Sequence, residues 1–155
     1  MKRLFCTLLL AISVQFLFAN QPYHFSHLSV KDGLSQLNVT CIYQDKLGYI
    51  WFGTRNGLNK FNGNSFEVYW NHADDPHSIS SNIINCMAED AEGNLWIGTE
   101  NGLNRLDKNK NEFKRYHINQ QENKDKNKIT SLCLDQQGTL WIGAASEGLF
   151  AYTPQ

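Results

Sequence analysis

Neither sign of charge dominates this chain, which carries 14 Lys and Arg residues against 15 Asp and Glu residues and has a formal net charge of −1. This balance argues against a nucleic-acid-binding protein, because such proteins gather basic residues on one face. Long apolar runs are also scarce, and the one substantial run is 4–18. It is short against the about 20 residues of a membrane-spanning helix. No stretch after residue 20 has helical spacing of its apolar residues.

The N-terminus has the residue order of a secretory signal. The basic residues Lys2 and Arg3 precede the apolar run, and small or polar residues follow it at Ala19 and Asn20. We therefore predict a signal peptide at 1–19 and export of the mature chain. An uncleaved membrane anchor is the competing interpretation, and the shortness of the run disfavours it.

Cysteine and histidine give little support for a chemical site. Behind the N-terminal run only Cys41, Cys86 and Cys133 remain, an odd number that disfavours a full set of disulfides even in an oxidising compartment. We predict that they are small buried hydrophobic residues. His72 and His77 share a polar loop with two Asp residues, so a metal ion is conceivable there. Without a Cys ligand or a short-spaced His pair, we predict no metal site.

The positive feature of the sequence is a repeat of 45 residues, marked by Trp51, Trp96 and Trp141. Around each Trp stands one pattern: Asp, two residues, Gly, two residues, Trp, one residue, Gly. Three matches at one spacing indicate a structural unit built several times. The residues of the pattern are Asp45, Gly48, Trp51 and Gly53, then Asp90, Gly93, Trp96 and Gly98, then Asp135, Gly138, Trp141 and Gly143.

Each unit contains short runs of apolar and β-branched residues separated by turn residues, which predict strands. The first strands of the three units are predicted at 39–44, 84–89 and 129–134. Four short antiparallel strands in about 45 residues make one blade of a β-propeller. We therefore predict an all-β chain, a partial β-propeller of about two and a half four-stranded blades. The expected parts are a lead-in at 20–37 that could close a last blade, blade 1 at 38–70, blade 2 at 83–116 and an incomplete blade 3 at 129–153.

The repeated residues are assigned structural roles. A blade packs on its neighbours, so a large flat side chain recurring at one strand position is predicted to lie in the core. The Gly after each Trp allows close approach of a neighbour. Each Asp opens a hairpin turn and accepts hydrogen bonds from backbone amides, while the next Gly takes a positive φ. Calcium binding, which needs about six to eight oxygen ligands, is less favoured. Glycoside hydrolysis is also less favoured, because it needs two carboxylates across a cleft.

The third unit differs from the other two. Its loop at 144–148 has one residue more, and the sequence reaches Gln155 without a fourth strand. Propellers close with about four to eight blades, so we expect this chain to be a fragment of a longer protein. The polar segments between units, 71–82 and 117–128, are expected to be solvated loops.

The ordered pattern resembles the two-component regulator propeller repeat. In the first unit the resemblance rests on 32–35, Val39 and 44–63, and the second unit is similar through 89–106. The third unit departs from the pattern after Gly143, where the expected Thr and its short loop are replaced. Because the whole pattern recurs, the resemblance covers nearly everything from residue 23 onward.

In that family, such repeats form exported sensor domains ahead of a membrane helix and a histidine kinase, and many members sense oligosaccharides. The resemblance implies the periplasmic sensor region of a hybrid two-component histidine kinase. It implies an oligosaccharide ligand, with the remaining blades and the kinase region as partners, and it leaves a homodimer open. This chain carries no kinase or hydrolase motif, so we expect no catalysis and no cofactor. The alternative is a fragment of an exported propeller enzyme, a polysaccharide lyase or glycoside hydrolase.

Candidate ligand-binding residues follow from the geometry of a propeller. Loops between the second and third strands, and loops between blades, lie on one face around the channel mouth. Varied polar side chains there suit a polar ligand, although solvated turns would explain each residue equally well. The candidates are Arg55, Asn56, Glu100, Asn101, Ser146 and Glu147.

Overall fold

The computed structural model describes residues 23–118 and 127–153, so the predicted signal peptide at 1–19 lies outside the described residues. Their regular structure is β throughout, apart from one short 3-10 helix at Val30–Asp32. This confirms the predicted all-β class. Among these residues there is no helix of the length and apolar character that crossing a membrane requires.

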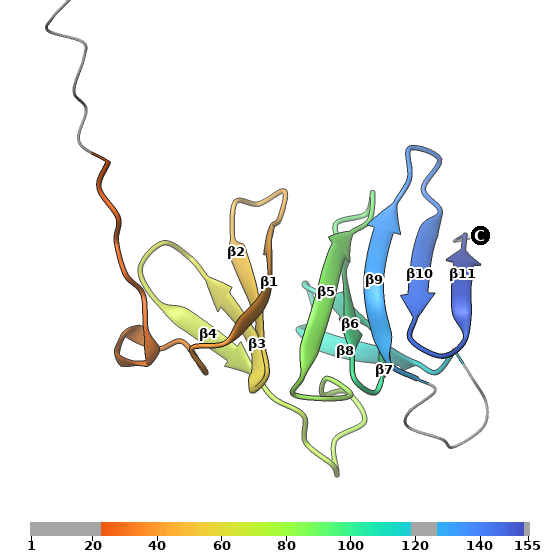
Figure 1. Cartoon of the computed structure of the whole chain (residues 1–155), viewed down its shortest axis with the longest axis horizontal. Coiled ribbons are helices and arrows are strands. Elements are labelled where there is room, and N and C mark those ends of the chain that lie inside the picture. The colour runs from red at the N-terminus through yellow and green to blue at the C-terminus, as the bar shows by residue number, and fades with distance from the viewer. Residues whose placement is uncertain (1–22, 119–126, 154–155) are drawn as a thin grey trace, which may run out of the picture.

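Three antiparallel sheets stand side by side (Figure 1), and within each sheet the strands pair in chain order. Two sheets have four strands and the third has three, which agrees with the predicted partial propeller. The first strands of the three sheets, β1, β5 and β9, follow one another in space, and β5 contacts both β1 and β9. The first sheet contains β1 (Val39–Gln44), β2 (Ile50–Thr54), β3 (Gly57–Phe61) and β4 (Phe66–Tyr69); the second β5 (Ile84–Glu89), β6 (Leu95–Thr99), β7 (Gly102–Asp107) and β8 (Glu112–Tyr116); the third β9 (Ile129–Leu134), β10 (Leu140–Ala144) and β11 (Gly148–Tyr152).

The first hairpin of each sheet closes through the repeated Asp and Gly. In the second sheet, Oδ1 of Asp90 accepts the backbone amide of Asn94 at 2.8 Å. Gly93 adopts φ = 84°, a left-handed conformation that side chains with a Cβ disfavour. The same arrangement occurs at Asp45 and Gly48 and at Asp135 and Gly138. The turn role that the sequence predicts for these carboxylates is therefore present in all three sheets.

Two apolar layers separate the three sheets. One gathers Trp51 and Leu58 of the first sheet against Ile84, Leu95 and Ile97 of the second. The other places Trp96 of the second sheet against the third, with the partners Ile129, Leu140 and Ile142. Each layer contains side chains from two neighbouring sheets. Each sheet therefore buries its apolar face only when its neighbour is in place, as in other repeat proteins.

The glycine after each Trp lies where the next sheet approaches. A Cβ on Gly53 would stand 2.8 Å from Cγ2 of Ile84, and one on Gly98 would stand 2.6 Å from Cγ2 of Ile129. Both Ile residues belong to the first strand of the following sheet. The small residue is therefore needed for sheet stacking.

The three tryptophans do not share one environment. Trp51 and Trp96 are 0% and 1% exposed, whereas Trp141 is 39% exposed. The core position expected for Trp141 is therefore wrong for the described chain. The reason is that no further sheet among the described residues covers the face of β9–β11 that carries Trp141.

The segment at 71–82 also differs from expectation, because part of it is buried. Ile79 is 0% exposed and lies in the layer between the first two sheets. Ser80 donates its backbone amide to Oδ1 of Asn104 at 2.9 Å, and its hydroxyl bonds Thr99 at 3.0 Å. A solvated loop is thus a wrong description of 78–80, which is a packed part of the repeat. Of the other polar segment, 119–126 lies outside the described residues.

The serine network recurs in the first sheet and is absent from the third. Ser35 bonds Asn59 and Thr54 at 2.8 and 3.0 Å. In the third sheet, Ala144 and Phe150 stand where the second sheet has Thr99 and Asn104. This substitution explains why the third unit departs from the sequence pattern after Gly143.

Candidate ligand-binding face

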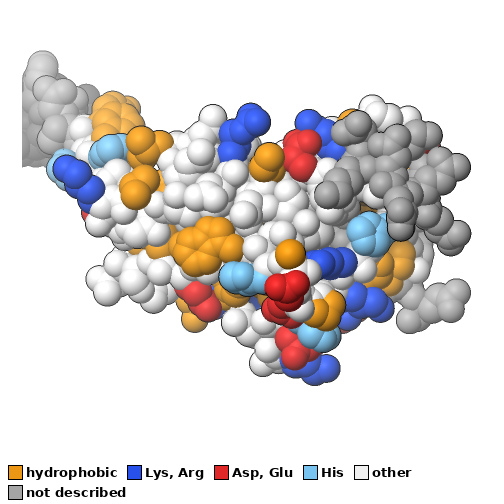
Figure 2. All heavy atoms as spheres, turned by 90° about the horizontal axis from the view of Figure 1, so that it is seen from below, with side chains coloured by type: hydrophobic (Ala, Val, Ile, Leu, Met, Phe, Trp, Pro, Cys, Tyr) orange, Lys and Arg blue, Asp and Glu red, His pale blue; other side chains and the backbone are white. Residues whose placement is uncertain are grey.

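One end of the sheets is formed by the turns between second and third strands together with the segments that lead from sheet to sheet. The amide of Gly57 donates to the carbonyl of Asn82 at 2.7 Å, and that of Gly102 donates to the carbonyl of Asn127 at 2.9 Å. The amide of Ala145 bonds the carbonyl of Lys128 at 3.0 Å. Backbone bonds therefore fix the turns against the connecting segments, and both lie on one face, which we call the loop face (Figure 2).

A hollow of about 790 Å³ opens on the loop face over the second and third sheets. Its volume is that of an ordinary small-molecule site. Its lining is mostly polar. It comes from the two segments that connect the sheets and from the turns between the second and third strands of the second and third sheets. The lining residues are Asn71, Ser80, Ser81, Asn82, Ile83, Glu100, Asn101, Lys128, Ala145 and Ser146.

Glu100 is the best-positioned charged group in the hollow. Its Oε1 accepts Nζ of Lys128 at 2.9 Å and lies 3.3 Å from Nδ2 of Asn85. Its backbone amide bonds the carbonyl of Ile83 at 3.1 Å. Two side chains orient the carboxylate and the backbone bond fixes the turn that carries it, while the side chain stays partly exposed.

The structure divides the six candidates into two groups. Glu100, Asn101 and Ser146 line the hollow together, whereas Arg55, Asn56 and Glu147 do not line it. The separation arises because the hollow lies over the second and third sheets and the turn at 55–56 belongs to the first. Asn56 instead uses its carbonyl oxygen to accept Nε1 of Trp70 at 3.2 Å.

Sequence reasoning missed several residues of this face. Lys128 lies in a nearly low-complexity polar run, which hides its position. Asn82 and Asn127 could have been found, because they are 45 residues apart and bond two turn glycines that are also 45 apart. Trp70 is the fourth tryptophan, and it falls outside the 45-residue spacing that identified the other three.

The opposite face holds a buried charge cluster that the sequence did not predict. Nζ of Lys108 lies 2.8 Å from Oδ2 of Asp45 and 2.8 Å from Oε1 of Glu89. The carboxylate side chains are 0% and 1% exposed and that of Lys108 is 15% exposed. The cluster therefore joins the first sheet to the second through buried ionic hydrogen bonds.

The pKa values of Asp45 and Lys108 shift in the directions that favour their charged forms. Burial opposes ionisation of Asp45, but hydrogen bonds from Lys108 and Trp51 outweigh it and lower the pKa of the carboxyl. Burial also opposes the charge of Lys108, and its bonds to Asp45 and Glu89 outweigh that effect and raise its pKa. Asp45 and Glu89 form a carboxylate pair, yet both oxygens face the ammonium group between them, so the pair has the geometry of a structural ion cluster.

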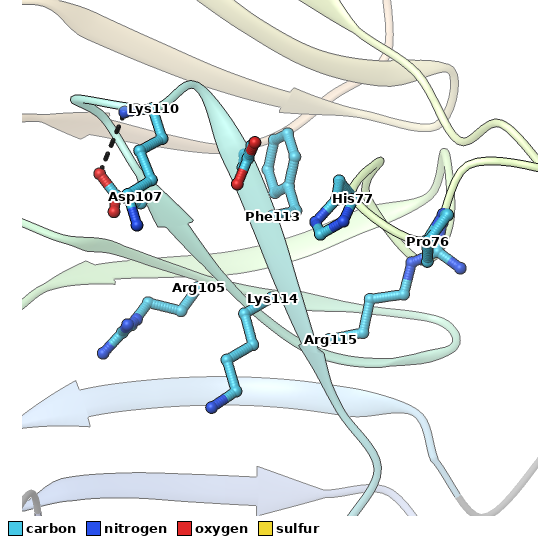
Figure 3. A pocket seen from close by; sticks show the side chains of 9 residues that line it. Pro76, His77, Arg105, Asp107, Lys110, Phe113, Lys114 and Arg115 are labelled. Carbon is cyan, nitrogen blue, oxygen red and sulfur yellow. Dashed lines mark hydrogen bonds between the residues drawn. The ribbon is translucent and has the colours of Figure 1, made fainter.

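A second hollow, of about 440 Å³, runs along the outer edge of β8 (Figure 3). Oδ1 of Asp107 accepts the amide of Lys110 at 3.2 Å, the dashed bond in the figure. Arg115 points toward Pro76 and bonds the carbonyl oxygens of Asp75 and Ser78, both at 2.8 Å. Arg115 thus fastens the segment before β5 to the edge strand, and Asp107 closes the turn between β7 and β8, so both side chains have a structural use.

The described residues contain no group of three or more His, Cys, Asp or Glu side chains that could hold a metal ion. Cys41 and Cys86 are free and half-buried, and Cys133 is free and exposed. The prediction of small buried cysteines is therefore wrong for Cys133, because the face that carries it is uncovered.

Comparison with known proteins finds three repeats, one for each sheet of the structure. The sequence profile of the family described as two component regulator propeller matches 33–56, 78–101 and 124–146. The repeats of this chain belong to the two-component regulator propeller family. The first two matches begin before the first strand of their sheets, in the segments that carry Ser35 and Ser80, so these segments are an integral part of the propeller repeat.

The propeller repeats are shared with a histidine kinase and with solved extracellular domains. Histidine kinase P4 of Formosa agariphila is 48% identical over 71 residues, which are 46% of this chain and 5% of that protein. The extracellular domain assigned to a hybrid two-component system of B. thetaiotaomicron is 31% identical, with a TM-score of 0.74 over 84% of this chain and 19% of that one. A second such domain from B. thetaiotaomicron, assigned to a one-component system, is 26% identical, with a TM-score of 0.66 over 85% of this chain and 19% of that one.

The chain therefore spans about a fifth of these solved domains. Virginiamycin B lyase from Staphylococcus aureus has the same fold at 18% identity, with a TM-score of 0.52 over 75% of this chain and 41% of that one. Such a likeness shows the fold alone.

Proposed function

We propose that this chain contributes propeller blades to the exported, periplasmic sensor domain of a hybrid two-component signalling protein. Its ligand would be a polar small molecule, an oligosaccharide, bound at the loop face. The observation that carries the proposal is the hollow of about 790 Å³ lined by Glu100, Asn101, Lys128 and Ser146. The extracellular placement of the related domains supports export.

The chemistry of the hollow suits a ligand rich in hydroxyl groups. Glu100 supplies acceptors, Lys128 supplies donors, and the side chains of Asn101 and Ser146 can do both. The turns that carry them are held by backbone bonds to the connecting segments, so little ordering is needed when a ligand binds. Variable side chains on a fixed scaffold are a common design for recognition.

In this proposal the chain binds and does not catalyse. Its ligand signal would pass to further blades and a kinase region of the same protein, with a homodimer as one arrangement that could transmit it. The alternative of an exported propeller enzyme needs an acid pair or a His-Tyr site in a cleft. Asp45 and Glu89 are buried around Lys108, so this pair does not supply the acid pair that the alternative needs.

The test is calorimetric titration of the chain with oligosaccharides, using two matched variants. Glu100→Gln combined with Asn101→Ala changes the turn in the hollow, and Arg55→Gln with Asn56→Ala changes the equivalent turn outside it. We expect the first variant to weaken binding at least about tenfold, since its groups are the polar contacts, and the second to bind as the parent does. Absence of heat with every oligosaccharide, or equal losses in both variants, would overturn the proposal.

A further inference from the structure

The fourth tryptophan, Trp70, has no packing role that the repeat requires. It follows β4 and is 43% exposed. The equivalent position in the second sheet, directly after β8, is occupied by His117, which is also exposed. In both sheets the residue lies near a turn glycine, Gly57 or Gly102. Because the second repeat folds with a histidine here, the tryptophan calls for another explanation.

The ring of Trp70 is held in one orientation. Its Nε1 donates to the carbonyl oxygen of Asn56 at 3.2 Å. A Cβ on Gly57 would stand 3.1 Å from Cδ1 of the ring, so the indole rests against the bare backbone of the glycine. One edge is therefore fixed by the turn while nearly half of the side chain stays open to solvent. A rigid exposed aromatic ring offers contact area at a low cost in conformational entropy.

The surroundings of Trp70 combine apolar and hydrogen-bonding groups. Trp70 lines a hollow of about 170 Å³ together with the aromatic residues Tyr69 and Phe113 and the polar residues His72, Asp75 and His77. The imidazoles of His72 and His77 make no side-chain hydrogen bond with any described residue. The face in Figure 2 shows hydrophobic, histidine and acidic side chains next to one another. The hollow has room for one ring-sized group and not for a whole oligosaccharide.

We propose that this hollow is a subsite for one pyranose ring, with Trp70 as its stacking platform. A pyranose has an apolar face of C–H bonds, which packs on the electron-rich face of an indole, and a rim of hydroxyl groups. His72, His77 and Asp75 are placed to bond those hydroxyls. This inference rests on the proposed function and adds a second subsite to the proposed binding site. The two hollows adjoin, because Asn71 follows Trp70 directly and lines the larger hollow of the loop face. One oligosaccharide could occupy both.

The experiment follows the four indole N–H signals of the whole chain by proton–nitrogen NMR. The probes are cellobiose, xylobiose, mannobiose and digalacturonic acid, each added to millimolar concentration. Trp70→His assigns the Trp70 signal and introduces the residue that the second repeat already accepts there. We expect at least one sugar to shift the Trp70 signal. Trp141 is the internal control, because it is exposed to a similar degree and lines neither this hollow nor the larger one.

Two further variants separate this inference from the proposed function. Trp70→His should weaken sugar binding at least about tenfold, and His117→Ala, at the matching position of the second sheet, should not change it. If Trp70→His binds as the parent does while Glu100→Gln with Asn101→Ala loses binding, the subsite is wrong and the loop-face proposal stands. If no sugar moves the Trp70 signal, or if every sugar moves Trp70 and Trp141 equally, the subsite is also wrong.

Discussion

The indole Nε1 of Trp96 donates a hydrogen bond of 2.8 Å to Oδ2 of Asp90. The same bond joins Trp51 to Asp45 at 2.9 Å and Trp141 to Asp135 at 2.8 Å. The other oxygen of each Asp holds backbone amides of the hairpin turn. The Asp and the Trp of the repeat therefore act together. The carboxylate of the Asp accepts hydrogen bonds both from the hairpin turn and from the indole ring.

This bond predicts unequal effects of one substitution at two repeats. Asp90→Ala should lower the free energy of unfolding by about 2–3 kcal/mol, because it leaves the indole N–H of a buried ring and the turn amides without an acceptor. Asp135→Ala should cost about 1 kcal/mol, since Trp141 is 39% exposed and water can replace the acceptor. Urea unfolding measures both, and equal losses would contradict this account.

Substitution of the glycine that follows the tryptophan should also have unequal effects on stability in two of the repeats. Gly98→Ala places a methyl group against Ile129 of the next sheet and should cost about 2 kcal/mol through overpacking. At Gly143 the close neighbours are side-chain atoms of Thr130 and Ser131, which belong to its own sheet and can rotate. Gly143→Ala should therefore cost less than half as much. Thermal unfolding of the two variants makes the comparison, and the reverse order would refute the stacking role of Gly98.

The sequence predicted the features that depend on residues close together in one repeat, and it missed contacts between repeats. The strands and hairpin turns follow from local patterns, so 39–44, 84–89 and 129–134 appear as strands in the structure with the bounds the sequence indicates. The Asp45–Lys108 bond links residues 63 apart in different sheets. Its Lys has no counterpart in the first repeat, where Gly63 stands at the same position, so periodicity could not reveal it.

For the candidate site, too, the sequence did not reveal features that depend on contacts between sheets. Propeller geometry correctly placed the turns and connecting segments on one face, but it could not say where along that face a hollow would form. The hollow is lined in part by Asn82 and Lys128 of the connecting segments, whose positions follow from contacts between sheets rather than from a local pattern. Ile79 was missed because its neighbours are polar, and its burial comes from packing between two sheets rather than from a strand pattern.

The charge cluster predicts a large effect for a single lysine. Lys108→Met removes the cation between Asp45 and Glu89 and leaves two buried carboxylates facing each other, which should lower the free energy of unfolding by about 2–4 kcal/mol. Lys60→Met is the matched control. Its ion pair with Glu67 is 3.6 Å long with side chains 25% and 53% exposed, and should contribute about 0.5 kcal/mol. Denaturant titration of both at neutral pH tests this, and similar midpoints would count against a stabilising cluster.

The same cluster predicts how stability varies with pH. The pKa of Asp45 is lowered from 3.8, so its stabilisation is complete above that value and is lost as the pH falls through the folded pKa. The pKa of Lys108 is raised from 10.5, so its stabilisation is complete below that value and is lost as the pH rises through the folded pKa. In Asp45→Asn with Lys108→Met both of these losses should be absent, so the unfolding free energy should fall less at low pH and at high pH than in the parent. An unchanged profile in the double variant would place the pH dependence elsewhere.

The three cysteines that follow the N-terminal apolar run should react with iodoacetamide in a fixed order. Cys133 is exposed, and its thiol should react first. Burial raises the pKa of Cys86 to about 12 and also raises the pKa of Cys41. Since the thiolate is the reactive form, both should react at least about tenfold more slowly than Cys133 at pH 8. Peptide mass spectrometry locates each label, Cys133→Ser should remove the fast phase, and unfolding in urea should make the rates alike. Fast labelling of Cys86 in the folded chain would show that the second and third sheets separate in solution, because Cys86 packs against the layer between them.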